Sequence, residues 1–252
     1  MQTLGIDLAA GVRDTATCTV EWGKKGARVD AVVTGRERSD ATDDAGLLTA
    51  IAAADRTGID VPFGWPSAFV TAVGRHDKGK RWRDEDRDAL RFRETDRDLR
   101  ERVVQVQPLS VSTEKLGVTA LRAAALLDEL TRRGVTIDRA GLNGTIAEVY
   151  PAAALCRWIG HRCQYKGRAP RDDRSELLSQ LLAGLGERFD MDVELRARCA
   201  ASDDAFDAFV CALVARAVER GRTDLPRKRQ RELARREGWI HVPAEGSLSA
   251  LS

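Results

Sequence analysis

The chain has 252 residues, of which 32% are charged, and its 41 basic and 39 acidic side chains leave a formal net charge of +2. This near-balance excludes a simple polycation, so any contact with nucleic acid would have to come from local basic patches. No segment approaches the roughly 18 apolar residues that span a bilayer, and the N-terminus lacks a basic-then-apolar signal segment, so we expect a cytoplasmic protein. The length suits one large domain, which we place over residues 1–252.

The first third of the chain predicts strands followed by a helix. Residues 4–10, 15–22 and 27–34 are three strand-like runs separated by glycines, which predicts an antiparallel meander. Acidic residues 43–44 precede apolar residues at helical spacing, the pattern of a helix N-terminus. The apolar run 58–66 predicts a short strand that two prolines end, so its carboxylate lies near a strand end, where α/β sheets hold their sites.

The remaining sequence alternates between helical and strand patterns. The dense charge of residues 75–115 predicts a helical insertion, and residues 221–252 form a C-terminal extension. Between them we expect a helix, a strand, a basic loop and two further helices, over residues 116–133, 144–151, 157–174, 174–187 and 203–220. Three antiparallel strands followed by parallel crossovers predict an α/β protein of RNase H-like fold, with a mixed five-stranded sheet and helices on both faces.

Acidic residues interrupt otherwise apolar stretches in four segments. They are Asp7, Asp60, Glu148, and the pair Asp204 and Asp207 at the start of the last helix. A carboxylate among apolar neighbours is costly unless something neutralises it, and oxygen-only ligands select Mg²⁺ or Mn²⁺. We therefore predict that all five are catalytic and that the four aspartates bind metal. For Asp7 the alternative is a buried carboxylate that accepts from backbone donors near Gly11, and for Asp60 it is a cap on the turn at residues 62–64. The pair has helix capping as its alternative, and Glu148 has an arginine partner or a water-orienting role.

The sequence offers few residues that could form other kinds of functional site. The five cysteines form no CxxC pair, which argues against a structural zinc site or a disulfide framework, and we interpret them as reduced thiols. Three scattered histidines also leave little for a histidine-rich metal centre or a Ser/His/Asp triad. Carboxylates are therefore the strongest candidates for a functional site.

Six motifs resemble, in the same order, those of the domain-of-unknown-function family 429 (DUF429), which is described as predicted nucleases of RNase H fold. The motifs lie at residues 5–7, 59–66, 93–97, 148–151, 204–213 and 237–240. The last helix also resembles that of RuvC-type resolvases, in which a DxxD pattern supplies two acids. The resemblance implies that Asp7 is the central ligand, that Asp207 is the closing ligand with Asp204 as its partner, and that Asp60 is the acid of the fourth strand. Asp203 stands where we expect histidine in many relatives, so no proton-transfer role follows for it.

The expected activity is hydrolysis of phosphodiester bonds in DNA or RNA, single-stranded or branched, by a two-metal mechanism. Basic segments 75–83, 157–174 and 220–236 could provide a phosphate track, although each can also be a solvated helix face. The substrate-binding candidates are Arg81, Trp82 for base stacking, Arg93, Lys166 and Arg168. Arg93 has an ordinary ion pair as its alternative, and the likeness to RuvC adds a homodimer as a further expectation.

Two alternatives to a nuclease stay open. An actin-like or sugar-kinase-like phosphotransferase shares the strand order, but it needs a glycine-rich hairpin where this chain has Gly11 alone, and usually a second domain. A non-catalytic module that binds nucleic acid or a nucleotide is the other alternative. Loss of a first-strand or last-helix acid would favour that module, and none is lost.

Overall fold

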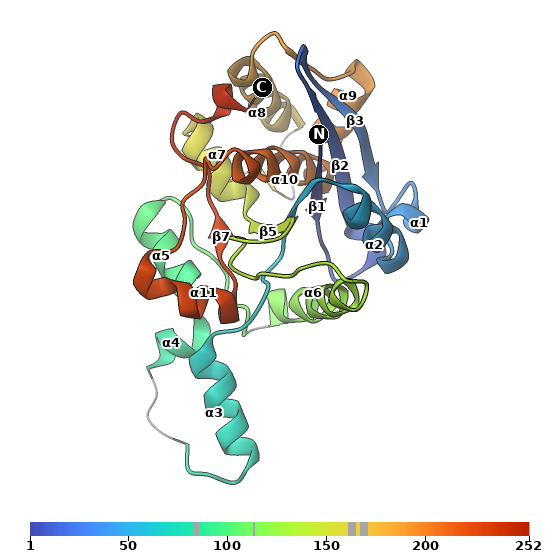
Figure 1. Ribbon diagram of the computed structural model, residues 1–252. Coiled ribbons are helices and arrows are strands. Elements are labelled where there is room, and N and C mark those ends of the chain that lie inside the picture. Colours follow the sequence, from blue (N-terminus) through green and yellow to red (C-terminus); the bar gives the residue numbers. More distant parts are fainter. Residues whose placement is uncertain (83–85, 113, 161–164, 167–170, 252) are drawn as a thin grey trace.

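The computed structural model describes residues 1–82, 86–112, 114–160, 165–166 and 171–251. Its strands form one mixed sheet in the order β6-β3-β2-β1-β4-β5-β7 (Figure 1). The strands are β1 (Gln2–Asp7), β2 (Ala16–Gly23), β3 (Gly26–Thr34), β4 (Arg56–Asp60), β5 (Ile146–Val149), β6 (Phe189–Asp190) and β7 (Ile240–His241). The predicted α/β class is therefore confirmed.

The sheet is antiparallel on one side of β1 and parallel on the other. Strands β1, β2 and β3 form the predicted meander, whereas β4 pairs in parallel with β1 and β5 in parallel with β4. The prediction of five strands was wrong, because the described sheet has seven. The two additional strands, β6 and β7, have two residues each, which is too short to give a periodic sequence pattern.

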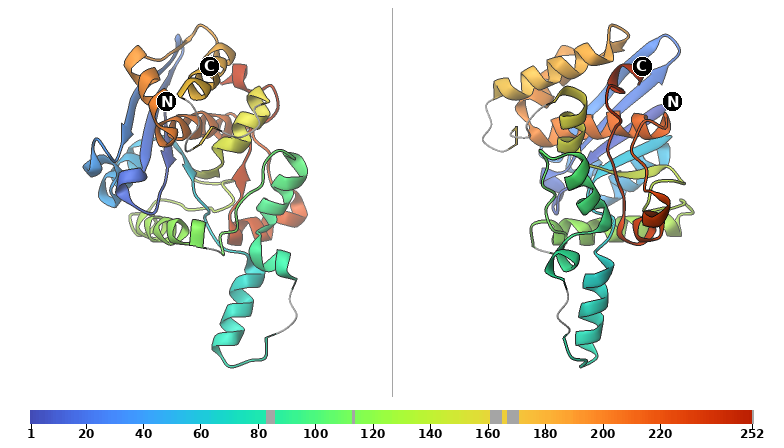
Figure 2. Two further views of the ribbon diagram at one scale, coloured as in Figure 1. Left: turned by 180° about the vertical axis from the view of Figure 1, so that it is seen from behind. Right: turned by 90° about the vertical axis from the view of Figure 1, so that its left-hand side faces the viewer.

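Helices cover both faces of the sheet. They are α1 (Ser39–Thr42), α2 (Asp44–Ala53), α3 (Ser67–Asp77), α4 (Arg87–Arg91), α5 (Glu94–Arg102), α6 (Glu114–Arg132), α7 (Pro151–Ile159), α8 (Arg171–Leu185), α9 (Val193–Ala201), α10 (Asp203–Glu219) and α11 (Arg231–Glu237). One face packs on α10 and the helices around it, α7, α8 and α9, while the other packs on α2 and α6 (Figures 1 and 2). Among the described residues, no helix is both long and apolar enough to cross a membrane.

The charged central segment, residues 75–115, begins at the end of α3 and contains α4 and α5. Helix α3 projects away from the sheet (Figures 1 and 2). Helix α5 instead packs against α11 and β7, so the C-terminal part of the chain lies beside this segment. Sequence reasoning missed α1, α3, α7, α9 and α11, and the predicted basic loop starts inside α7 and ends inside α8.

Candidate metal centre

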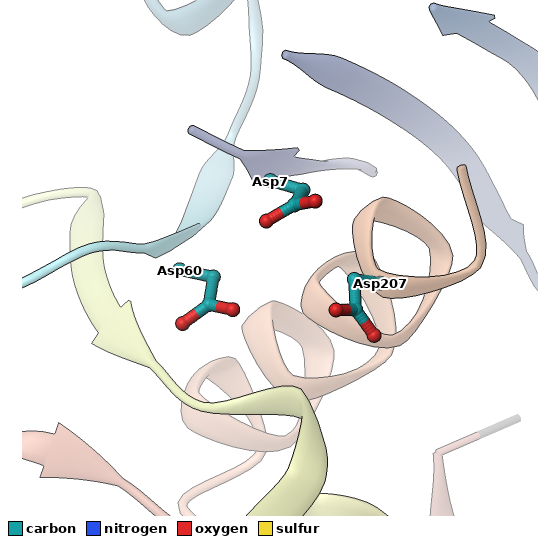
Figure 3. A group of neighbouring side chains, drawn as sticks. All are labelled: Asp7, Asp60 and Asp207. Atoms are coloured by element: carbon teal, nitrogen blue, oxygen red, sulfur yellow. The ribbon is translucent and has the colours of Figure 1, made fainter. Parts of the chain in front are cut away.

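Three of the five predicted acidic residues meet at one end of the parallel strands. Asp7 ends β1 and Asp60 ends β4, and the two are direct partners in the parallel register of these strands. Asp207 belongs to the first turns of α10. One carboxylate oxygen from each residue lies within 4.8 Å of the other two, and Figure 3 shows the three side chains facing a common point.

Two glycines explain why α10 comes so close to the strands. Gly5 and Gly58 are partners in the β1–β4 register, two residues before Asp7 and Asp60, so they share the face of the sheet on which the acids lie. A Cβ atom at Gly5 would lie 2.0 Å from the Ala208 carbonyl oxygen, and one at Gly58 would lie 2.6 Å from that of Cys211. Because neither residue has a side chain, the α10 backbone rests directly on the strands and brings Asp207 to their ends.

Asp207 is held by two consecutive residues, Tyr165 and Lys166. The Tyr165 hydroxyl donates a hydrogen bond of 2.5 Å to Asp207 Oδ1, and both side chains are buried. Lys166 Nζ lies 2.5 Å from Asp207 Oδ2 and 3.9 Å from Asp60 Oδ2. The Arg174 guanidinium donates to the Tyr165 carbonyl oxygen, which fixes the backbone at this point. The cluster therefore consists of three carboxylates, one phenol and one ammonium group.

The electrostatics of the cluster disfavour three ionised acids. Burial, followed by the neighbouring Asp207 carboxylate, raises the pKa of Asp7 well above its ordinary value. Burial also raises the pKa of Asp60 to about 7, although Lys166 lowers it. For Asp207, burial raises the pKa and Lys166 again opposes the shift. A single ammonium group, half-exposed to solvent, does not offset one buried acid, Asp207, and two partly buried ones, Asp7 and Asp60.

The donor set suits a hard divalent cation. All three candidate ligands are carboxylates, which Mg²⁺ and Mn²⁺ prefer. Asp207 Oδ2 is buried and, apart from its ion pair with Lys166, has no hydrogen-bond partner among the described residues. A cation among Asp7, Asp60 and Asp207 would supply the positive charge that the cluster lacks.

Asp204 and Glu148 lie outside this cluster. Asp204 is one turn before Asp207 on α10, and burial, followed by the adjacent Asp203, raises its pKa to about 6. It lies outside the group of three acids that could share an ion. Burial raises the pKa of Glu148, but the Arg93 guanidinium lowers it. The structure therefore brings together three of the four aspartates predicted as ligands.

Glu148 belongs instead to a buried ion-pair network, which we call the Arg93 network. Arg93 Nε and Nη2 donate to the two oxygens of Asp96, at 3.1 and 2.9 Å. Arg93 Nη1 and Nη2 contact Glu148 Oε2 and Oε1, at 2.9 and 2.7 Å, and Nη1 also donates to the Glu237 carbonyl oxygen. Gly238, at φ +94°, completes the packing, because a Cβ atom there would lie 2.4 Å from Glu148 Oε2. Arg93, predicted to bind substrate, thus has acidic partners on both sides and a buried side chain.

Comparison with known proteins identifies the family of the chain. Residues 5–231 match the family model described as "Protein of unknown function (DUF429)". The chain belongs to the DUF429 family. No curated protein and no solved structure gives a significant match.

The remaining predicted substrate-binding residues of this DUF429 chain are distributed unevenly. Lys166 lies in the carboxylate cluster. Arg81 and Trp82 are exposed residues that follow α3, and the Trp82 ring contacts that of His76 at 5.7 Å between centroids. Arg168 falls outside the described residues. Tyr165 was missed, and its one sequence signal is an aromatic residue next to Lys166 within a basic segment.

A cavity of about 590 Å³ in the DUF429 chain opens beside the carboxylates. Asp7, Asp60, Tyr165 and Lys166 are among its lining residues. Arg93, Asp96 and Glu148 also line it, which places the Arg93 network next to the acidic cluster. Two groups of acids therefore share a single cavity: Asp96 and Glu148, which both pair with the Arg93 guanidinium, and Asp7 and Asp60, which lie near the half-exposed Lys166.

Proposed function

We propose that this protein is a Mg²⁺- or Mn²⁺-dependent nuclease of RNase H-like fold that hydrolyses phosphodiester bonds of nucleic acid. The observation that carries the proposal is the convergence of Asp7, Asp60 and Asp207 within 4.8 Å. These acids come from two strands and a helix that are far apart in sequence, and their mutual repulsion favours a bound cation.

The sheet topology supports the proposed fold. Its five central strands have the order β3-β2-β1-β4-β5, with β1 at the centre and the two strand-borne acids on the adjacent pair β1 and β4. The third acid comes from α10, which crosses the same face of the sheet. This is the arrangement that the RuvC-like pattern of the sequence implies, with Asp207 as the closing ligand.

Each side chain of the cluster has a role in this proposal. Asp7, Asp60 and Asp207 hold the cation, and Tyr165 fixes the orientation of Asp207 through its hydrogen bond. When bound, the cation supplies activation of water and neutralisation of charge at a phosphodiester. Lys166 is half-exposed beside the acids and provides a positive charge for a phosphate oxygen. The role of Asp204 as a further ligand stays a prediction.

One observation favours a second candidate function. Because the Lys166 ammonium already pairs with Asp207 and lies near Asp60, the cluster has a cationic partner from the chain itself. A non-catalytic module that binds nucleic acid or a nucleotide could keep the acids in this form. Metal binding separates the two functions, since the module needs no cation among the carboxylates.

The test combines metal binding with cleavage. Purified protein is titrated with Mn²⁺ by calorimetry, and then incubated with Mn²⁺ and labelled single-stranded, duplex, hybrid and junction substrates. We expect Asp7→Asn and Asp207→Asn to lose both Mn²⁺ binding and cleavage. Glu176→Gln, an exposed acid on α8, is the control that should retain both. Absence of Mn²⁺ binding together with absence of cleavage on every substrate would favour the binding module.

A further inference from the structure

The cavity beside the carboxylates has a wall that the metal centre does not explain. Gln105, Val106, Gln107, Pro108 and Leu109 form this wall, which we call the 105–109 wall. Leu116, Thr119 and Tyr150 extend the lining beside it. Amide, hydroxyl and apolar groups thus line the cavity next to the acids, a mixture typical of sites for small organic groups.

The 105–109 wall is held in place by its neighbours. It belongs to the segment between α5 and α6, in which Val103, Val106 and Val111 are buried anchors. The Ser110 hydroxyl donates to the Arg91 carbonyl oxygen at 2.8 Å, and the Ser112 hydroxyl donates to that of Leu90 at 3.0 Å. The backbone of the wall is therefore held by buried and hydrogen-bonded neighbours.

Leu109 is the residue of the wall whose position most needs an explanation. Its apolar side chain is 50% exposed, and it lines the cavity. The neighbouring side chains of Gln105 and Gln107 are also exposed, and each carries an amide that can both donate and accept hydrogen bonds. An apolar surface flanked by such amides suits a nucleobase, which has a flat apolar face and a polar edge.

The charges around the cavity limit how much phosphate it can accept. Among the described lining residues, Asp7, Asp60, Asp96 and Glu148 are acidic, whereas Arg93 and Lys166 are basic. Arg93 is buried and paired with Asp96 and Glu148, whereas Lys166, which pairs with Asp207, is half-exposed, so Lys166 is the cation of this lining that a phosphate can reach. Even with a divalent cation in the cluster, this lining suits one phosphate group rather than a track for several.

We propose that the cavity binds one unpaired nucleotide, with its base against the 105–109 wall and its phosphate at the carboxylate cluster. The volume of about 590 Å³ is in the range of cavities that enclose a small ligand, whereas a base pair within a duplex is held in a stack that cannot enter it. This inference rests on the proposed nuclease function, which it deepens: the scissile phosphate lies next to a single-stranded or extruded nucleotide.

The first experiment compares ligands that differ by the base alone. Calorimetry in Mg²⁺ measures the affinity of the full-length protein for adenosine 5′-monophosphate and for ribose 5-phosphate. We expect the nucleotide to bind about tenfold more tightly, because apolar contact with the base adds affinity. Equal affinities, or no binding of either ligand, would overturn the assignment of the cavity to a base.

The second experiment truncates two exposed side chains of the wall and leaves its buried residues unchanged. The double variant Gln107→Ala/Leu109→Ala should weaken binding of adenosine 5′-monophosphate about tenfold and leave ribose 5-phosphate unchanged. Val104→Ala is the matched control, because Val104 is in the same segment and 79% exposed but does not line the cavity. An equal loss in the control and the double variant would contradict the proposal.

Cleavage assays separate this inference from the proposed function. On one sequence, supplied single-stranded and as a blunt duplex, we expect at least about tenfold faster cleavage of the single strand. Equal cleavage of both forms would overturn the nucleotide cavity while leaving the nuclease intact. Binding of the nucleotide without cleavage of any substrate would do the opposite, since it would support the cavity and contradict the nuclease.

Discussion

The carboxylate cluster and the Arg93 network differ in how their acids are paired with positive charge. In the network, Arg93 contacts both oxygens of Asp96 and both oxygens of Glu148. In the cluster, Asp7, Asp60 and Asp207 share the half-exposed ammonium of Lys166. A buried acid is therefore a poor marker of function by itself. The marker is a group of acids whose charge the chain leaves largely uncompensated.

Of the substitutions that test this comparison, Arg93→Ala should have the largest effect on the free energy of unfolding. Removing the guanidinium leaves Glu148 and Asp96 buried without their cation, so the free energy of unfolding should fall by about 3–5 kcal/mol. Urea denaturation measures the change. The control is Arg97→Ala, on the helix α5 that begins directly after Arg93; the ion pair of Arg97 with Glu94 is about one-third exposed and should contribute about 1 kcal/mol or less. Similar losses in the two variants would mean that the network is not a structural unit.

Within the cluster, Tyr165→Phe should give the next largest effect. The variant keeps the buried ring but loses the hydrogen bond to Asp207, which should cost about 1.5–3 kcal/mol of stability because the acceptor is an acid. We also expect Mn²⁺ affinity to fall about tenfold, because Asp207 loses the group that orients it. Calorimetry with Mn²⁺ and thermal unfolding check both. Unchanged metal affinity would show that Asp207 needs no orientation by Tyr165.

A smaller, pH-dependent effect is expected from Asp60→Asn. The pKa of Asp60 is about 7 in the folded protein, against an ordinary value of 3.8. Between these pH values the folded state retains a proton that the unfolded state has lost, so the stability of the metal-free wild type falls as pH rises through this window. Asparagine cannot ionise. The metal-free variant should therefore gain on the order of 1 kcal/mol relative to wild type at pH 8, and little at pH 4.

Urea denaturation from pH 4 to pH 8 measures this difference. The pKa of buried His241 is lowered to about 4, so this residue makes the folded state less stable as pH falls. His241 is present in both proteins, and its contribution cancels in the difference. Excess Mg²⁺ should stabilise the wild type at pH 8 and not the variant. A stability difference that is independent of pH would contradict the interpretation of Asp60 as an uncompensated acid.

The smallest effect on stability is expected from Trp82→Ala, outside both regions. Trp82 is half-exposed beyond α3, so the free energy of unfolding should change by less than about 0.5 kcal/mol. Because Trp82 does not line the cavity, binding of adenosine 5′-monophosphate should stay unchanged. Calorimetry on the variant tests this. Weaker nucleotide binding would show that the projecting segment takes part in the site.

Much of the fold could be predicted from local patterns. The alternation of residues 15–34 and the proline stops after Asp60 and Glu148 indicated strands that the structure confirms. The long apolar pattern of residues 203–220 likewise indicated α10. The two-residue strands β6 and β7 could not be found in this way, because sheet pairing rather than periodicity defines them.

The sequence by itself determined which acids are costly to bury in ionised form, because a carboxylate within an apolar stretch is expected to lose its contact with water on folding. Asp60 and Glu148 look alike at this level, since each lies at or near the end of a short apolar strand. Only the tertiary structure decided that their environments differ. It brings Arg93 to Glu148 from 55 residues away. It brings Asp7, Asp207 and Lys166 to Asp60. The physical reason is that charge compensation depends on distances of a few ångströms, which chain folding sets and sequence spacing does not.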